Sequence, residues 1–358
     1  MRKITLFLFV LSQSIVFSQT KGFSIKESIK AAHTIALDFQ KNENVPGMAI
    51  SVSRNGNIIW SEGFGYSNLN DSLKVNPSVT QFRIASISKS LTAAALAKLM
   101  DDEQLDLDES VYTYVPDFPR KEYDFTVRQA GGHIAGIRHY NGSEFILNKK
   151  MSIVEGLDIF KDSDLKFEPG TDFSYSTYGW NLLSVVVQNA SKIEFNDYMI
   201  MEIFEPLNML STALDLSDQE MPNRTLFYNK TNAESIVLGP EVSNEHKVAG
   251  GGFVSTSEDL IKFGNEIISP KVFSVASINE LVKEQYLDNG KGTGYGVGFG
   301  VGKTKKGTVS YSHSGGGIGA TTLLLMYPEE NIVISIVTNI SGLPISHFGE
   351  QLEAVFIN

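Results

Sequence analysis

Ser86 and Lys89 are a serine and a lysine whose spacing could activate a nucleophile. A serine hydroxyl attacks a carbonyl poorly unless a neighbouring base removes its proton. Residues three apart on a helix share a face, and their side chains lean toward the helix N-terminus, so the amine could reach the hydroxyl. If Ser86 begins that helix, free backbone N–H groups beside it would favour a developing oxyanion. The pair therefore predicts acyl-transfer chemistry.

The spacing alone is a weak signal, because two other serines also have a lysine three residues later. These are Ser18 with Lys21, and Ser163 with Lys166, which precedes a Pro-Gly turn. Ser86 could also be an ordinary helix N-cap. Its surroundings favour the catalytic interpretation, since a strand hairpin precedes it and an Ala- and Leu-rich helix follows it.

Two further motifs follow Ser86 along the chain. The first is the stretch 167–177, which contains Tyr175 and Thr177 and precedes an apolar helix at 182–187. The second lies at the end of a β-type run and consists of His313, Ser314, Gly315 and Gly316. Each alone has an ordinary explanation: a capped loop with a packed aromatic residue for the first, and a tight turn for the second. Together with the Ser-Lys pair they indicate one catalytic site.

The pattern of strands and helices predicts an α+β fold. Asn55-Gly56 between two β-type runs is typical of a hairpin, because both residues tolerate the positive φ of a type I′ turn. The other expected elements are strands near 309–313, 321–327 and 332–338, and helices at 23–42, 86–99 and 348–356. We expect one hydrolase domain over 19–358, with an α/β lobe at about 23–110 and 236–358 and an inserted helical lobe at about 111–235.

The composition excludes several classes of protein. The 358 residues include no cysteine, which rules out disulfides, thiolate metal sites and a cysteine nucleophile. The formal net charge is −11 and no basic cluster is visible, so we expect no nucleic-acid partner. The sequence contains no His-Glu-x-x-His motif and no phosphate-binding loop, so we expect no metal and no cofactor.

The N-terminus predicts export. Residues 1–3 are a short basic start, and residues 4–17 are mostly apolar, which is typical of a signal peptide. We expect a signal peptide at 1–18, cleavage after Ser18, and a periplasmic or secreted mature protein with no membrane span. An uncleaved N-terminal anchor is the alternative, although the apolar run is short for a spanning helix.

The three motifs resemble the active-site boxes of the serine β-lactamase-like superfamily, the group of class C β-lactamases, DD-peptidases and carboxylesterases. Within it, the sequence is similar to the mitochondrial serine β-lactamase-like (LACTB) family, which is described as a peptidase family. The resemblance covers essentially the whole mature chain and implies a β-lactamase-like fold, an antiparallel sheet flanked by helices with an all-helical insertion. The stretches that carry it are 82–92, 136–140, 175–179, 257–264 and 313–316.

The resemblance implies a role for each motif. Ser86 would be the acylated nucleophile, Lys89 its hydrogen-bonded partner, and Tyr175 a proton shuttle between nucleophile, leaving group and water. The backbone N–H groups of Ser86 and Gly316 would form the oxyanion hole. The substrate cleft would be lined by His313, Ser314, Gly315 and Thr177. An ammonium at Lys89 would lower the pKa of the Tyr175 phenol.

Three departures from the superfamily's pattern weaken a β-lactamase assignment. The stretch 130–136 lacks the apolar side chains and hydroxyls that are usual there, which would loosen a loop near the cleft. Thr177 stands where class C β-lactamases carry asparagine, and His313 stands where they carry lysine. With a reference pKa of about 6.5, His313 would hold a substrate carboxylate progressively less well as the pH rises.

We therefore expect a serine hydrolase that cleaves a small peptide, amide or ester through an acyl-enzyme on Ser86, as a LACTB-like peptidase. Carboxylesterase, DD-peptidase and β-lactamase are the alternatives within the enzyme class. A catalytically silent penicillin-binding-like scaffold, which binds peptide or assembles into a homo-oligomer, is the alternative outside it. A scaffold would have no need for all three of Ser86, Lys89 and Tyr175, so the motifs favour the enzyme.

Overall fold

The centre of the molecule is a seven-stranded antiparallel sheet. The computed structural model describes residues 24–357, so the predicted signal peptide at 1–18 lies outside the described residues. In spatial order the strands are β3 (Leu73–Lys74), β2 (Asn57–Asn68), β1 (Gly47–Arg54), β12 (Ile332–Thr338), β11 (Ala320–Tyr327), β10 (Val309–Gly317) and β9 (Gly300–Lys303). Strands from the two ends of the chain meet where β1 pairs with β12. The α+β class predicted from the sequence is confirmed.

The hairpin between β1 and β2 forms as the sequence predicts. Asn55 and Gly56 adopt φ values of 52° and 77°, and Arg54 pairs with Asn57 across the turn. Positive φ at both central residues matches the right-handed twist of the flanking strands. Residues 328–331 likewise form the turn that connects β11 to β12.

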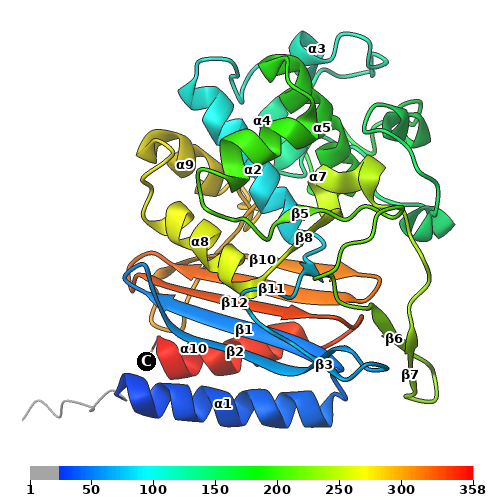
Figure 1. Ribbon diagram of the computed structural model, residues 1–358. Helices are drawn as coiled ribbons and strands as arrows, with labels where there is room; N and C mark the ends of the chain where they lie inside the picture. The colour runs from blue at the N-terminus through cyan, green and yellow to red at the C-terminus, as the bar shows by residue number, and fades with distance from the viewer. Residues whose placement is uncertain (1–23, 358) are drawn as a thin grey trace, which may run out of the picture.

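Two helices cover one face of the sheet. The first, α1 (Ile25–Asn42), and the last, α10 (Ile345–Phe356), lie side by side beneath the strands in Figure 1. Ser24 caps α1 reciprocally: its Oγ accepts from Glu27 N at 3.3 Å, and its own N donates to the Glu27 carboxylate at 2.8 Å. Phe39 of α1 stacks on Phe348 of α10 with ring centroids 4.1 Å apart. The chain ends thus close this side of the core.

The other face of the sheet carries the helical half of the molecule (Figure 1). Its buried axis is α2 (Ile87–Asp101), whose alanines and serines let neighbouring helices pack closely. The helices on this side are α3 (Val111–Tyr114), α4 (Val127–Gly131), α5 (Thr177–Ser191), α6 (Phe195–Tyr198), α7 (Val248–Gly251), α8 (Ser257–Ile268) and α9 (Val275–Val282). Because α7 and α9 both contact α2, this half also draws on residues that the sequence assigns to the α/β lobe.

Short elements join the two halves. A three-stranded sheet has the order β4 (Phe82–Arg83), β8 (Phe253–Ser255) and β5 (Ala213–Leu214), and β6 (Tyr228–Lys230) pairs with β7 (Ile236–Leu238). The remaining elements are the short 3₁₀ helices η1 (Gly142–Ile146), η2 (Glu155–Ile159) and η4 (Glu245–Lys247) and the π-helix η3 (Met199–Phe204). Since β4 leads directly into α2, its pairing with β8 fixes where that buried helix starts.

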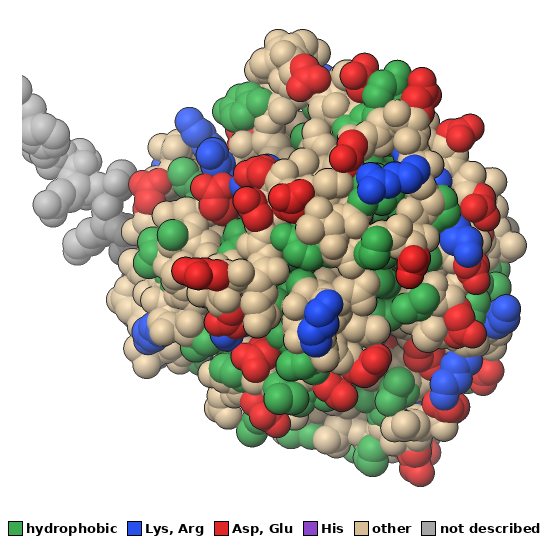
Figure 2. All heavy atoms as spheres, turned by 90° about the horizontal axis from the view of Figure 1, so that it is seen from above, with side chains coloured by type: hydrophobic (Ala, Val, Ile, Leu, Met, Phe, Trp, Pro, Cys, Tyr) green, Lys and Arg blue, Asp and Glu red, His purple; other side chains and the backbone are tan. Residues whose placement is uncertain are grey.

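The surface agrees with the acidic composition. On the helical face shown in Figure 2, basic side chains lie singly among acidic ones, so this face presents no basic patch of the kind that nucleic acids need. Within residues 24–357, every helix is too short or too polar to cross a lipid bilayer.

Candidate active site

Ser86 sits at a strained turn between β4 and α2. Ile84 N donates to the Phe253 carbonyl at 3.1 Å, which ties the end of β4 to β8. Ala85 then adopts a φ of 45°, a left-handed conformation that costs energy for any residue with a side chain. Ser86 is the N-cap residue of α2, yet its hydroxyl makes no capping hydrogen bond. The hydroxyl is therefore available for chemistry, which is not how an ordinary N-cap serine behaves.

Lys89 lies one turn into α2, and its amine points back at Ser86. Lys89 Nζ is 3.1 Å from Ser86 Oγ, 3.2 Å from Thr177 Oγ1 and 2.5 Å from the Gly250 carbonyl oxygen. The side chain is fully buried, and no carboxylate of the described chain forms an ion pair with it. Burial without a counter-charge lowers the pKa of Lys89 well below its usual value. This shift favours the neutral amine, which can accept a proton.

The competing Ser-Lys pair at 163 and 166 does not form. Ser163 Oγ instead accepts from Arg138 Nε at 2.9 Å, and Lys166 Nζ donates to Ser174 Oγ at 2.6 Å. Ser18 and Lys21 lie outside the described residues. Of the described Ser-x-x-Lys sequences singled out above, the one at Ser86 brings its hydroxyl and amine together.

Tyr175 lies beside Lys89, with Lys89 Nζ 4.9 Å from the centroid of the phenol ring. His133 packs on that ring at 4.3 Å, and His139 meets it edge-on at 5.7 Å. Burial raises the pKa of Tyr175 to about 12, and a hydrogen bond with Ser86 offsets this only in part. Our expectation that Lys89 lowers the pKa of Tyr175 is wrong, because burial favours an amine without positive charge.

Thr177 supports Lys89 from the start of α5. Ser176 caps this helix, since its Oγ accepts from Gly179 N at 3.1 Å. Thr177 N donates to His139 Nδ1 at 3.1 Å, while the Thr177 hydroxyl lies against the amine of Lys89. Thr177 lines the cavity at Ser86, but the hydroxyl that we expected to serve the substrate is already engaged by Lys89.

The loop at 130–136 is tightly held, so the expectation that it is loose is wrong. A Cβ at Gly132 would lie 1.6 Å from Gln285 Nε2, and a Cβ at Gly136 would lie 2.5 Å from the Phe167 carbonyl oxygen. His133 has a φ of 65°, and its Nδ1 accepts from Ser176 N at 3.1 Å. Close packing around the glycines holds the loop in place of the apolar side chains and hydroxyls that the superfamily usually has there.

Strand β10 forms the wall opposite Tyr175. At Gly315 the strand presses on the segment before Ser86: a Cβ there would lie 2.3 Å from the Ile84 carbonyl oxygen and 2.2 Å from Thr322 Oγ1. At Gly316 a Cβ would meet nothing within 4 Å. The strand therefore touches the turn before Ser86 at Gly315 and opens onto Ser86 at Gly316, where we expect the oxyanion hole.

His313 lies on β10 but is not a cation. Its Nε2 lies 2.8 Å from the Tyr295 hydroxyl, and its Nδ1 lies 2.7 Å from the Ser314 carbonyl oxygen. A carbonyl can only accept, so Nδ1 carries the proton and Nε2 accepts from Tyr295. Burial is the main cause that lowers the pKa of His313, to about 3. The expectation that His313 titrates near neutral pH and holds a substrate carboxylate is therefore wrong.

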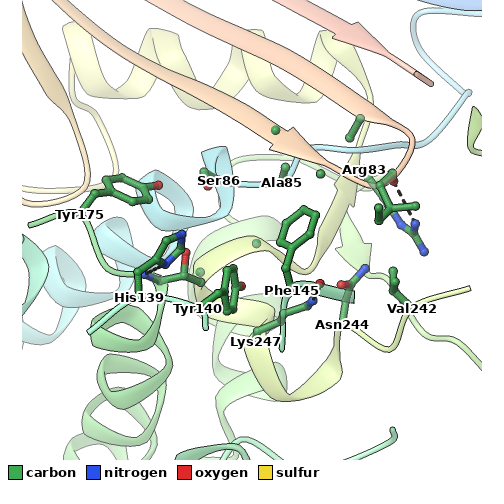
Figure 3. A pocket seen from close by; sticks show the side chains of 17 residues that line it. Arg83, Ala85, Ser86, His139, Tyr140, Phe145, Tyr175, Val242, Asn244 and Lys247 are labelled. Atoms are coloured by element: carbon green, nitrogen blue, oxygen red, sulfur yellow. Dashed lines mark hydrogen bonds between the residues drawn. The ribbon is translucent and has the colours of Figure 1, made fainter. Parts of the chain in front are cut away.

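Two cavities meet at Ser86, and both are also lined by Tyr175 and Gly316. One cavity has a volume of about 350 Å³, and its other lining residues are Tyr295, Gly300, Ser312, His313 and Ser314. The other, of about 200 Å³, is drawn in Figure 3 and adds, among others, His139, Tyr140, Phe145, Asn244 and Lys247. The sequence motifs did not single out Phe145, Asn244, Lys247 or Tyr295, because distant segments bring them to the site. In residues 24–357, no three histidine, aspartate or glutamate side chains are grouped to hold a metal ion.

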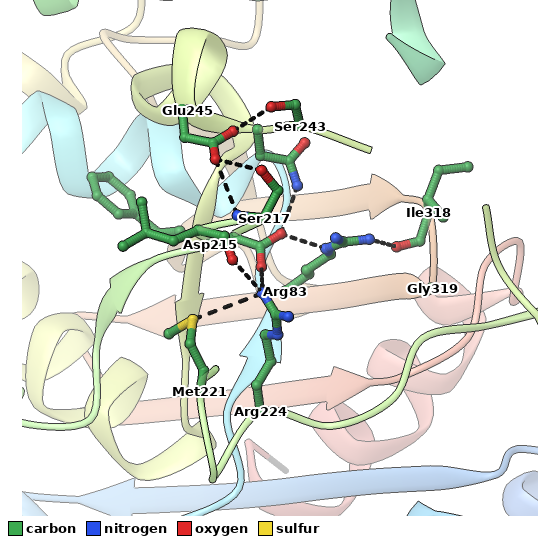
Figure 4. Close-up of polar contacts among 12 residues, drawn as sticks. Arg83, Asp215, Ser217, Met221, Arg224, Ser243, Glu245, Ile318 and Gly319 are labelled. Atoms are coloured by element: carbon green, nitrogen blue, oxygen red, sulfur yellow. Dashed lines mark hydrogen bonds and ion pairs between the residues drawn. The ribbon is translucent and has the colours of Figure 1, made fainter. Parts of the chain in front are cut away.

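A buried ionic network braces the turn that carries Ser86 (Figure 4). Arg83 Nε binds Asp215 at 2.6 Å, and Arg83 also donates to the Ile318 carbonyl at 3.1 Å, in the turn after β10. The other Asp215 oxygen binds Arg224 at 2.7 Å, and Asn244 Nδ2 donates to Asp215 at 2.7 Å. Because the Asp215 side chain is only 1% exposed, solvent screens these contacts little. The network ties β4, β5 and the β10–β11 turn together.

Gly315→Ala and Gly316→Ala form a matched pair that tests the contact between β10 and the turn before Ser86. We expect Gly315→Ala to lower the free energy of unfolding by about 1–3 kcal/mol, the range for overpacking a close contact. Gly316→Ala should change it by less than about 0.5 kcal/mol, because its Cβ enters open space. Urea denaturation measures both, and equal losses would show that β10 does not press on Ile84.

Asp215→Asn should destabilise the protein by about 3–5 kcal/mol, because it leaves two largely buried guanidinium groups without a counter-charge. Asp218→Asn is the control, since its pair with Lys150 is at the surface and should contribute less than about 1 kcal/mol. Urea denaturation measures the free energy of unfolding of both variants and of the unaltered protein. A loss in Asp215→Asn as small as in the control would contradict the bracing role of the network.

The chain is similar to known proteins in both sequence and structure. A family model described as Beta-lactamase matches residues 34–353. The serine beta-lactamase-like protein LACTB of Mus musculus, described as mitochondrial, is 30% identical and matches 90% of this chain and 78% of its own length. The octameric penicillin-binding protein homologue from Pyrococcus abyssi has a TM-score of 0.78 at 24% identity, covering 92% of this chain and 77% of that one. EstCE1, described as a hydrolase with promiscuous acyltransferase activity, has a TM-score of 0.80 at 18% identity. This match covers 93% of this chain and 99% of the EstCE1 chain.

These comparisons confirm the β-lactamase-like fold and correct the predicted location. The mouse relative is described as mitochondrial, which contradicts the prediction of a periplasmic or secreted protein. That prediction rested on a basic start and an apolar run in the first 18 residues, which lie outside the described residues. A basic start followed by an apolar run occurs in N-terminal segments that direct proteins to different compartments. The composition of this segment therefore does not identify the compartment.

Proposed function

Because this chain belongs to the Beta-lactamase family, we propose that it is a serine hydrolase that cleaves a peptide, amide or ester bond through an acyl-enzyme on Ser86. The observation that carries the proposal is the 3.1 Å contact between Lys89 Nζ and Ser86 Oγ in a buried site without a counter-charge. A buried amine with a lowered pKa is suited to act as the base that a serine nucleophile needs.

Acylation begins as Ser86 Oγ attacks the substrate carbonyl carbon and its proton passes to Lys89. A neutral amine has two N–H donors and one lone pair. The Gly250 carbonyl and the Thr177 hydroxyl accept the two N–H bonds, which leaves the lone pair directed at Ser86 Oγ. The carbonyl oxygen becomes an oxyanion, and the backbone N–H groups of Ser86 and Gly316 stabilise it.

Tyr175 then serves as the proton donor to the leaving group. Its raised pKa, about 12, keeps the phenol protonated at ordinary pH. As the bond to the leaving group breaks, Tyr175 gives its proton to the departing nitrogen or oxygen and is reprotonated by the Lys89 ammonium. In deacylation a water attacks the acyl carbonyl, its proton passes to the same base, and Ser86 leaves with its hydroxyl restored.

The substrate is a small peptide, amide or ester, and a LACTB-like peptidase is the activity that we favour. Carboxylesterase and DD-peptidase activities use the same chemistry and are separated by substrate assays. β-Lactamase activity is less favoured, because the Thr177 hydroxyl serves Lys89 and His313 is neutral. Assembly into a homo-oligomer stays a prediction for this chain; the Pyrococcus abyssi homologue is described as octameric.

Labelling with a fluorophosphonate separates this enzyme from a catalytically silent scaffold. We expect one covalent adduct by intact-mass spectrometry, mapped to Ser86, because the neutral Lys89 activates that hydroxyl. Ser86→Ala should abolish the adduct, while the control Ser163→Ala should be labelled like the unaltered protein. An adduct that persists in Ser86→Ala, or no adduct in the unaltered protein, would overturn the assignment.

A further inference from the structure

A buried lysine other than Lys89 lines the cavity drawn in Figure 3. Lys247, at the end of η4, lines this cavity together with Ser86 and is only 5% exposed. Its Nζ lies 5.6 Å from the centroid of the Tyr140 ring and 5.7 Å from that of the Phe145 ring. The ammonium thus sits at the lining of the cavity among aromatic faces, within the space that a substrate bound at Ser86 would enter.

The hydrogen-bonding capacity of Lys247 is mostly unused. An ammonium has three N–H donors. One of them donates to the Phe145 carbonyl at 2.9 Å, and no carboxylate in residues 24–357 lies within ion-pair distance of Lys247 Nζ. A buried charge without a partner is costly, so a buried lysine that faces a cavity is suited to receive an anion there.

The carboxylates nearest to Lys247 are committed to other groups. Asp215 binds Arg83 and Arg224, as described above. Glu245 accepts from Ser217 and Ser243, at 2.7 Å and 2.6 Å between side-chain oxygens. Neither carboxylate therefore neutralises the charge of Lys247 by direct contact.

The other cavity has no comparable cation among its lining residues. His313 is neutral, and both of its ring nitrogens are used within the protein. The remaining side chains there are the hydroxyls of Ser86, Tyr175, Tyr295, Ser312 and Ser314. Charge recognition beside Ser86 therefore falls to the cavity that contains Lys247.

We propose that Lys247 binds a carboxylate carried by the substrate, so that the hydrolase prefers substrates with an acidic group over their neutral counterparts. This inference rests on the proposed function, because it concerns the cavity beside the acylated serine. Tyr140 and Phe145 would pack against the carbon chain that bears the carboxylate. A cavity of about 200 Å³ has room for a group of that size.

The preference should depend on pH through the charge of Lys247. Burial and the positive charge of Arg83 lower the pKa of Lys247 to about 8, against the opposing effect of Asp215 and Glu245. The phenol of Tyr140, which also faces Lys247, stays protonated, because burial raises its pKa. Lys247 is charged below its pKa, so binding of the anionic substrate should be strong at pH 7 and should weaken as the pH rises past 8.

The experiment compares pairs of esters that differ by a carboxylate. One pair places it on the acyl group (4-nitrophenyl glutarate against 4-nitrophenyl pentanoate), and the other on the leaving group (4-carboxyphenyl butyrate against phenyl butyrate). Ser86→Ala gives the blank for spontaneous hydrolysis. We expect at least one pair to show a preference for the anion of about tenfold or more in kcat/KM at pH 7, carried mainly by KM.

Lys247→Met should remove most of that preference, and Lys247→Arg should keep it and abolish its decline above pH 8, because a guanidinium stays charged. Lys150→Met is the control, since Lys150 is an exposed lysine outside the cavity and should leave both pairs unchanged. If Lys247→Met does not fold, the decline of the preference between pH 7 and 9 in the unaltered protein still tests the proposal.

Two results would overturn the role of Lys247. They are equal hydrolysis of anionic and neutral esters in both pairs, and a preference that Lys247→Met retains or that stays constant through pH 8. In both cases the neutral esters are still cleaved, so the proposed function stands. If no ester is cleaved and Ser86 takes no fluorophosphonate, the proposed function itself fails, and the inference fails with it.

Discussion

The buried amine of Lys89 is the constraint on which the site depends. An ammonium in this position would have to lose its hydration without a carboxylate in compensation, which is expensive. The neutral form avoids that cost and needs two acceptors, which the Gly250 carbonyl and the Thr177 hydroxyl provide. The lone pair that remains faces Ser86. In the proposed mechanism, burial lowers the pKa of Lys89 so that it can act as a base, and these hydrogen bonds orient its amine.

The two halves of the molecule cooperate to bury this amine. The helical half supplies α2, α5 and α7, whose ends converge on Lys89. The sheet supplies β10, whose Gly315 is pressed against the turn before Ser86. The ion pair between Arg83 and Asp215 also holds that turn. Ala85 keeps its unfavourable left-handed conformation because these surrounding contacts fix the backbone there. In this strained turn the Ser86 hydroxyl makes no capping hydrogen bond.

Local patterns predicted the parts of the site that depend on local geometry. The contact of Lys89 with Ser86 follows from helix spacing, and the Asn55-Gly56 hairpin follows from turn chemistry. The ionisation of Tyr175 and of His313 could not be predicted in this way, because burial determines it and burial comes from long-range packing. Lys247 was missed for the same reason, since no motif connects it to Ser86 along the chain.

The most direct test of this account is the ionisation of Lys89 in the free protein. Nitrogen-15 NMR of protein labelled on lysine Nζ distinguishes an amine from an ammonium, and Lys89→Met identifies the signal by its loss. We predict that the Lys89 signal changes from that of an ammonium to that of an amine at a lower pH than the signals of the exposed lysines, because burial lowers the pKa of Lys89. A Lys89 signal that titrates together with those of the exposed lysines, or above them, would contradict the account.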